Sequence, residues 1–270
     1  MTAEHGGFRL ATLSFGQYRG SMAANSRLTS AEFKQIGDRC GTDKTLQHGY
    51  HRFYPAHLAP LSQLNDFGIL EIGYGEGSSI SLWRALYPRA FVYCFDRDVE
   101  DEGEGYRVIK ADQSSPESLS LAIAKIEHEV HLVVDDGSHN PAHQLQTFSH
   151  LFSSLLAPQG VYIVEDIETS YWLDGELYGY ATHYGLFNHW SAIEAFKLIV
   201  DYTNRSFLAP CDQSQLEYRL AMVGLDPQAS ALVGSVTFAQ NFVVLSKADA
   251  SDMAYYDRPY VYGERSQRCP

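Results

Sequence analysis

The sequence predicts an α/β protein built on a doubly wound, mainly parallel sheet, and three observations lead to this fold class. Short apolar runs recur along the chain, at residues 68–72, 90–96, 106–111, 131–135 and 160–165. Segments with helix-start signals separate them, as expected for parallel strands joined by crossover helices. The run before Asp135 is apolar almost throughout, which is typical of strands buried on both faces. With two more strands expected at 216–223 and 235–246, the sheet has seven strands.

Composition and charge restrict the class of protein. The chain has 270 residues, 45% hydrophobic and 20% charged, enough for one large domain with a buried core. It has no apolar stretch of membrane-spanning length, no signal-peptide layout at Met1 to Gly20, and no Cys-x-x-Cys spacing. We therefore expect a cytoplasmic protein without a membrane segment, a zinc knot or a disulfide framework. A net charge of −13 without a basic cluster argues against nucleic acid and favours a small-molecule partner.

The chain divides into three parts by pattern. Residues 1–36 form an arm and a short helix, which Thr29 and Glu32 open as a capping box. The main domain spans residues 37–248, with residues 171–205 as a substrate cap, and residues 249–270 form a polar tail. A segment rich in His and Tyr begins at Gly41-Thr42-Asp43-Lys44. This segment is either a lid over a pocket or a surface helix with aromatic packing.

A glycine-rich turn follows the first strand and leads into a helix that ends near Leu86. Glycines allow positive φ angles and close approach of a ligand to the backbone. Ser78 stands where a dinucleotide fingerprint needs its third glycine, whereas the spacing Glu71-x-Gly73-x-Gly75-x-Gly77 fits the first motif of S-adenosylmethionine-binding methyltransferases. The residues expected to contact that cofactor here are Glu71, Gly73, Tyr74, Gly75, Gly77 and Ser78.

The next two strand ends carry further candidate cofactor contacts. Asp96 ends the second strand roughly 20 residues after the loop, where an acid accepts hydrogen bonds from ribose hydroxyls. The alternative is a solvated turn carboxylate. Asp112 and Gln113 follow the third strand, where the adenine edge would lie, and Ser115-Pro116 begins a helix that ends near Ile126.

Two neighbouring strand ends concentrate the reactive side chains. The strand at 131–135 runs into Asp135, Asp136, Gly137, Ser138 and His139, and the strand at 160–165 runs into Glu165 and Asp166. Parallel sheets bind ligands at the carboxyl ends of their strands. Asp136, Glu165 and Asp166 are hard oxygen donors suited to Mg²⁺, and His139 is a suitable base for a hydroxyl that the ion polarises.

Two other interpretations of these residues stay open. In the first, a zinc ion is bound by His139, His143 and Asp136, although His139 precedes the helix and no catalytic Glu lies between the histidines. In the other, the acids cap helix N-termini and His139 is an ordinary turn residue.

The remaining elements follow from start signals and periodicity. Asn140-Pro141 begins a helix that buries one face. A later helix beginning at Asn188 places four residues in the core, namely Trp190, Ile193, Phe196 and Val200.

The paired segments resemble the metal-dependent class I S-adenosylmethionine sugar O-methyltransferases of macrolide biosynthesis. The resemblance rests on Val134-Asp135-Asp136-Gly137-Ser138-His139, on Glu165-Asp166-x-x-Thr169-Ser170-Tyr171-Trp172 and on Gly41-Thr42-Asp43-Lys44, and it covers roughly residues 37–247. Glu168 departs from it, since a His is expected there, and the portion before residue 37 is shorter than the auxiliary domain of that family.

The resemblance implies a Rossmann-like class I methyltransferase fold and a set of roles. Mg²⁺ would bind Asp136, Glu165 and Asp166, His139 would be the general base, and S-adenosylmethionine would also contact Asp135. Thr169, Ser170, Tyr171 and Trp172 would meet the substrate, a glycosylated natural product, in a homo-oligomer such as a dimer or tetramer.

The sequence thus predicts Mg²⁺-dependent O-methylation of a sugar hydroxyl. Three alternatives remain: methylation of a catechol-like or other phenolic acceptor, a nicotinamide-dependent oxidoreductase, and a non-catalytic binding module.

Overall fold

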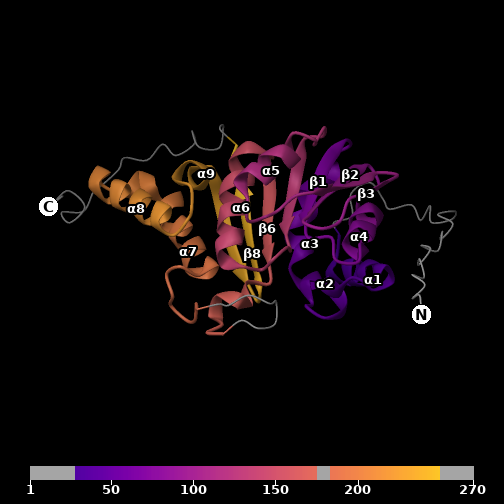
Figure 1. The fold of residues 1–270 in the computed structure, drawn as a ribbon, viewed down its shortest axis with the longest axis horizontal. Coiled ribbons are helices and arrows are strands. Elements are labelled where there is room, and N and C mark those ends of the chain that lie inside the picture. The colour runs from indigo at the N-terminus through magenta and orange to yellow at the C-terminus, as the bar shows by residue number, and fades with distance from the viewer. Residues whose placement is uncertain (1–27, 175–182, 250–270) are drawn as a thin grey trace, which may run out of the picture.

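The chain folds around a single eight-stranded sheet with helices on both faces, in a computed structural model that describes residues 28–174 and 183–249 (Figure 1). The strands lie in the order β3-β4-β2-β1-β5-β6-β8-β7. Their bounds are β1 Phe67–Ile72, β2 Ala90–Asp96, β3 Asp101–Gly103, β4 Tyr106–Lys110, β5 Val130–Asp135, β6 Leu156–Glu165, β7 Val233–Ala239 and β8 Phe242–Lys247.

The sheet is mainly parallel and doubly wound, as predicted. The five strands β4, β2, β1, β5 and β6 pair in parallel, whereas β3, β8 and β7 pair antiparallel with their neighbours. From β1 the chain builds outward through β2 to one edge, and then returns to build from β5 to the other. The strand order therefore reverses between β1 and β5, which is where ligands bind in open α/β sheets.

The predicted strand count of seven is wrong because of three differences. The short β3 adds an edge strand, and the run predicted at 235–246 is a hairpin of two strands, β7 and β8. The prediction of a strand at 216–223 is wrong, because those residues fall mainly in the helix α8, Pro210–Met222. Leu216 and Leu220 are buried four residues apart, which is helical spacing.

The described residues form nine α-helices and four 3₁₀ turns. The helices are α1 Ser30–Cys40, α2 Asp43–Leu46, α3 Tyr54–Leu58, α4 Ser78–Leu86, α5 Pro116–Ile123, α6 Pro141–Ser154, α7 Ala192–Thr203, α8 Pro210–Met222 and α9 Pro227–Ala231. The turns are η1 Tyr50–Arg52, η2 Ala59–Gln63, η3 Ile167–Tyr171 and η4 Arg205–Phe207. The predicted capping box at Thr29 and Glu32 and the predicted cap at Asn140 are both confirmed.

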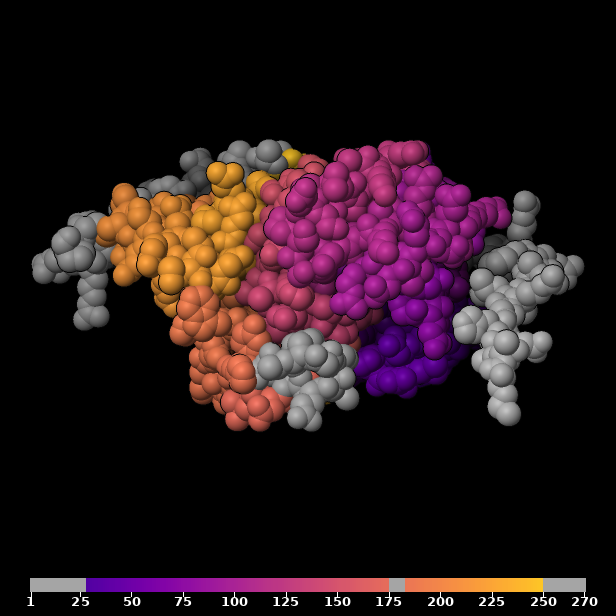
Figure 2. All heavy atoms as spheres, viewed as in Figure 1, coloured from indigo at the N-terminus to yellow at the C-terminus, as the bar shows by residue number. Residues whose placement is uncertain are grey.

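Two hydrophobic cores lie on opposite faces of the sheet. On one face α1, η1, α3 and α4 pack through side chains such as Phe33, Tyr54 and Trp83. On the other face α5 to α9 pack through side chains such as Phe148 and Phe196. Figure 2 shows the second face, where α5 and α6 cover the sheet and α8 lies to one side. The molecule is thus a three-layer sandwich, and the strand ends are left to form its site.

The helix predicted from Asn188 begins later, at Ala192, with Ser191 as its N-cap. Ile193 and Phe196 are buried as predicted, but Trp190 and Val200 are 43% and 41% exposed. The prediction of these two as core residues is therefore wrong: Trp190 precedes the helix, and Val200 points away from the face that buries Ile199.

Three further findings bear on the sequence predictions. Across 28–174 and 183–249, none of the helices is long and apolar enough to cross a membrane. Cys211 is disulfide-bonded, which its spacing did not predict, whereas Cys40 and Cys94 are free thiols. The predicted arm at 1–27, the tail beyond residue 249 and residues 175–182 of the predicted cap lie outside the described residues.

Candidate active site

The strand ends that carry the predicted site lie side by side. Ile72 of β1 is in register with Asp135 of β5, which is in register with Val164 of β6. Gly73, Asp136 and Glu165 therefore come at neighbouring points of one edge, beside the reversal of strand order. This is the arrangement that the sequence predicts for the crevice.

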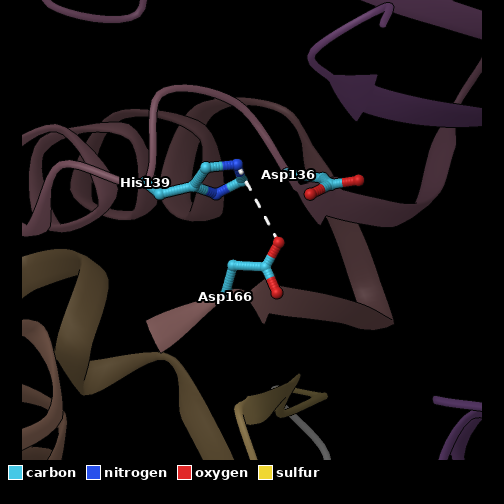
Figure 3. Close-up of side chains that lie close together, drawn as sticks. All are labelled: Asp136, His139 and Asp166. Atoms are coloured by element: carbon cyan, nitrogen blue, oxygen red, sulfur yellow. Dashed lines mark ion pairs between the residues drawn. The ribbon is translucent and has the colours of Figure 1, made fainter. Parts of the chain in front are cut away.

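Asp136, His139 and Asp166 form a compact cluster at this edge. One ligand atom from each lies within 4.8 Å of the others, and Figure 3 shows the His139 ring and the Asp166 carboxylate pointing toward one another. His139 Nε2 is 3.9 Å from Asp166 Oδ2, and the side chains are between 7% and 19% exposed. Two carboxylates and an imidazole at this spacing suit a divalent cation.

The backbone at both strand ends is held in an unusual conformation. His139 and Asp166 have positive φ angles of 53° and 52°, which non-glycine residues rarely adopt. The Thr169 hydroxyl donates to the His139 carbonyl at 2.7 Å, so the two loops are tied together. Such conformations persist where surrounding contacts enforce them, and they are concentrated at functional sites.

Glu165, the third predicted metal ligand, lies beside Asp136 and shares its partner Lys44. Its side chain is 1% exposed, with Oε2 2.5 Å from the Lys44 ammonium and Oε1 accepting from the Tyr54 hydroxyl. The structure thus brings Asp136, His139 and Asp166 together, and places Glu165 in a buried pair behind them.

Lys44 is the functional residue that the sequence reasoning missed. Its fully buried ammonium lies 2.6 Å from Asp136, 2.5 Å from Glu165 and 3.0 Å from Glu71. Burial alone would lower the pKa of Lys44, but the carboxylates outweigh it and raise the pKa well above its usual value. The available signal was a lysine in a polar turn of a segment interpreted as a lid or a surface helix.

Asp166 is held by a second set of partners. Its Oδ1 accepts from the Tyr50 hydroxyl and from Asn241 Nδ2 at 2.8 Å, and lies 3.3 Å from His48 Nδ1. Asn241 lies in the β7–β8 turn with a positive φ of 60°. Residues from the N-terminal segment and from the last hairpin therefore orient one carboxylate.

Burial and neighbouring charges shift the pKa values of the acids at the site in different directions. Burial raises the pKa of Asp166 and, more strongly, that of Glu165. Burial also acts to raise the pKa of Asp136, but Lys44 and His139 outweigh it and lower that pKa. Asp136 is therefore the carboxylate most firmly kept ionised.

The glycine-rich loop that follows β1 packs directly against the backbone that follows β5. A side chain at Gly73, whose φ is 97°, would collide with the carbonyl oxygen of Asp136. Gly75 and Gly77 also have positive φ angles, and Gly77 is the N-cap of α4, which Ser78 begins. Glu71 faces inward, accepting from Trp83 Nε1 at 2.6 Å and pairing with Lys44, so its side chain supports the loop from below.

Asp96 is tied to the loop by backbone hydrogen bonds. Its carboxylate accepts from the N–H groups of Tyr74 at 3.0 Å, Asp98 at 2.8 Å and Val99 at 2.9 Å. Burial acts to raise the pKa of Asp96, but these donors outweigh it and lower that pKa. Asp112 is held in a similar way, because its Oδ1 accepts from the backbone and the hydroxyl of Ser114. Both acids are fixed, ionised acceptors at the crevice.

Asp135 lies beneath the crevice rather than in it. Its fully buried carboxyl group accepts from Gln113 Nε2 at 2.6 Å and from the Tyr162 hydroxyl at 3.1 Å. Burial raises the pKa of Asp135 to about 7. Gln113 Oε1 in turn accepts from the N–H of Ser138 at 2.9 Å, so Asp135 fixes Gln113 against the loop that carries His139.

The four predicted substrate residues, three in η3 and Trp172 directly after it, divide into two pairs. Thr169 and Ser170 are buried and hydrogen-bonded within the protein. Tyr171 is 46% exposed, and Trp172 is partly exposed beside it. His143, from the alternative zinc site, pairs through Nδ1 with the Ser138 hydroxyl at 2.8 Å.

Comparison with known proteins gives sequence relatives of one kind. The chain is 38% identical over 143 residues to 8-demethyl-8-alpha-L-rhamnosyl tetracenomycin-C 2'-O-methyltransferase of Streptomyces olivaceus, covering 50% of this chain and 37% of that protein. It is 36% identical over 114 residues to mycinamicin VI 2''-O-methyltransferase of Micromonospora griseorubida, and this match covers 38% of this chain and 28% of that protein. The chain resembles sugar O-methyltransferases. The matches span about a third of those relatives' length, and no family model matches the chain.

The structural comparison gives the fold. The chain superposes on the MycE methyltransferase from the mycinamycin biosynthetic pathway, solved in complex with Mg, SAH and mycinamycin VI, with a TM-score of 0.66 and 21% identity. The match covers 85% of this chain and 57% of that one. The fold is that of a class I methyltransferase, as predicted.

Proposed function

We propose that the chain catalyses Mg²⁺-dependent transfer of a methyl group from S-adenosylmethionine to a sugar hydroxyl of a glycosylated natural product. The observation that carries this proposal is the Asp136, His139 and Asp166 cluster beside the Gly73 loop. The acceptor class is supported by the two relatives, which are named as O-methyltransferases of rhamnosyl tetracenomycin-C and of mycinamicin VI.

The residues at the site fit both implied groups. Asp136 and Asp166 are hard oxygen donors within reach of one ion, and they would hold Mg²⁺. Glu165 would join them if its carboxylate exchanged Lys44 for the ion. The positive-φ turn from Gly73 to Ser78, the fixed acceptors Asp96 and Asp112, and Gln113 would hold the cofactor, with Asp135 and Glu71 positioning them from below.

The chemistry follows from where the side chains stand. When bound, S-adenosylmethionine supplies an electrophilic methyl group and Mg²⁺ supplies positive charge that stabilises the acceptor alkoxide. His139 takes the proton from the acceptor hydroxyl, and Asp166, 3.9 Å away, stabilises the resulting imidazolium. The Thr169 hydroxyl holds the His139 backbone in place. Tyr171, which is exposed, and Trp172, which is partly exposed, would contact the acceptor.

We also propose how the chain is organised. Residues 37–248 would form the methyltransferase domain after an N-terminal segment at 1–36. α7 packs in the core, so the part of 171–205 that caps the substrate would precede Ala192. A cytoplasmic location is proposed from the sequence pattern, and a homo-oligomer from the resemblance.

Calorimetric titration of S-adenosylmethionine and S-adenosylhomocysteine tests the cofactor assignment. We expect micromolar binding by the wild type and loss of binding in Gly73→Ala, whose new side chain would displace the Asp136 backbone. Gly224→Ala is the matched control, since Gly224 also has a positive φ, of 92°, but lies after α8 with open space around it. Absence of binding to the folded wild type would overturn the proposed function.

A further inference from the structure

A buried lysine joins three strand ends beneath the proposed metal site. Lys44 lies on α2, whose N-cap Thr42 accepts a hydrogen bond from the Lys44 N–H at 3.4 Å. Its side chain reaches across the edge of the sheet to β1, β5 and β6, through Glu71, Asp136 and Glu165. The lysine is fully buried, so these contacts replace its hydration.

The Lys44 ammonium donates hydrogen bonds to Asp136 and Glu165 and forms an ion pair with Glu71. Lys44 Nζ meets Glu71 Oε1, Asp136 Oδ2 and Glu165 Oε2, all within 3.0 Å. The second oxygens of Glu71 and Glu165 accept from Trp83 and Tyr54. The second oxygen of Asp136 is not engaged by Lys44, and Asp136 is also the member that belongs to the cluster with His139 and Asp166.

We propose that Lys44 is a positioning residue of the metal site, a fixed internal cation that anchors Asp136 and Glu165 and joins them to Glu71 beneath the cofactor loop. This inference rests on the proposed function, because it concerns the ion that Asp136 and Asp166 would hold. Lys44 touches neither the acceptor nor the methyl group in this account. It sets the orientation of the carboxylates that do the binding.

The direction of the change in metal affinity distinguishes this anchoring role from the electrostatic effect of the lysine charge alone. Removing a positive charge beside Asp136 would, by Coulomb's law alone, strengthen binding of a cation. Removing an anchor has the opposite effect, since buried carboxylates that lose their shared partner rotate out of position. Loss of partners that orient metal ligands typically weakens metal affinity about 10–100-fold.

Binding of Mn²⁺, followed by electron paramagnetic resonance of the free ion, provides the test. We expect Lys44→Met to bind Mn²⁺ about 10–100-fold more weakly than the wild type. Lys34→Met is the control: Lys34 also pairs with an acid, Asp38 at 2.7 Å, but on the exposed surface of α1, and its replacement should leave Mn²⁺ affinity unchanged.

A charge-balanced double variant keeps the test decisive if Lys44→Met alone does not fold. Lys44→Met with Glu71→Gln removes one charge of each sign, and Glu71→Gln alone keeps the Lys44 contacts to Asp136 and Glu165. We expect the double variant to lose Mn²⁺ affinity by the same factor relative to the wild type. Because the local net charge is that of the wild type, this loss reports anchoring.

The outcomes distinguish the inference from the proposed function. Weaker Mn²⁺ binding in both lysine variants, with S-adenosylhomocysteine still bound by the wild type, supports the role of Lys44. Equal or tighter Mn²⁺ binding in those variants overturns that role and leaves the proposed function standing. A wild type that binds S-adenosylhomocysteine but no Mn²⁺ or Mg²⁺ overturns both the metal part of the proposed function and the inference.

Discussion

Replacing Tyr54 with Phe removes one hydroxyl from the most buried part of the site. That hydroxyl donates to Glu165 Oε1, and both side chains are at most 1% exposed. The ring itself would stay in place, since it stacks on Phe33 at 5.1 Å and packs against Phe242 at 5.1 Å. The substitution therefore tests a single hydrogen bond to a desolvated carboxylate.

The expected loss of stability follows from the nature of the acceptor. A hydrogen bond to a charged group contributes about 1.5–3 kcal/mol, and a buried acceptor without a donor carries its own desolvation cost. Because Lys44 still contacts Glu165 Oε2, we expect a loss of about 2 kcal/mol in the free energy of unfolding. For a domain of this size that corresponds to a fall in Tm of roughly 4–8 °C.

Urea unfolding at neutral pH measures this loss, with Tyr106→Phe as the matched control. The Tyr106 hydroxyl also donates to a carboxylate, Asp101 at 3.0 Å, but close to the surface, where a substitution typically costs less than about 0.5 kcal/mol. Equal losses in Tyr54→Phe and Tyr106→Phe would refute the reasoning, because Glu165 would then not depend on an internal donor.

Three further predictions follow from single contacts. His139→Ala should lower kcat about 10²–10⁴-fold with unchanged S-adenosylhomocysteine affinity, measured by steady-state kinetics and calorimetry; an unchanged kcat would remove His139 as the base. Burial raises the pKa of Asp135 to about 7 from an unfolded value near 3.9, so its proton stabilises the folded state at low pH and that contribution is lost as the pH rises from about 4 to 7. Urea unfolding of Asp135→Asn across that range should lack this part of the fall, and a parallel profile would contradict the buried titration. Asn241→Gly keeps the positive φ of 60° but removes the amide that donates to Asp166, and should weaken Mn²⁺ binding about tenfold; unchanged binding would show that Tyr50 alone suffices.

The parallel half of the sheet could be predicted because its signals are local. Each strand is a short apolar run, and each run ends in the residues that the chemistry needs, so Asp136, His139 and Asp166 follow from pattern and from the rule for strand ends. The segment 216–223 shows the limit of this reasoning. Its apolar residues also fit the helical spacing that buries Leu216 and Leu220, and pattern alone assigned them to a strand.

The side chains that hold the acids of the site in place could not be predicted in the same way. Lys44 meets Glu165 across 121 positions of the chain, and Tyr50 and Asn241, which share Asp166, are 191 positions apart. No local periodicity encodes such pairs, which arise only when α2, β6 and the last hairpin meet. The partners of Glu165 illustrate this: its position at a strand end was predicted, but its contacts with Lys44 and Tyr54 were not.

Transfer of a labelled methyl group from S-adenosylmethionine to glycosides tests the central claim most directly. The acceptors are 8-demethyl-8-alpha-L-rhamnosyl tetracenomycin-C and mycinamicin VI, with the wild type and Asp166→Asn compared in Mg²⁺ and in excess chelator. We predict O-methylation of a sugar hydroxyl by the wild type in Mg²⁺, loss of transfer in chelator, recovery when Mg²⁺ is restored, and little transfer by Asp166→Asn. Transfer that proceeds equally well in chelator, or that is unaffected in Asp166→Asn, would contradict this prediction.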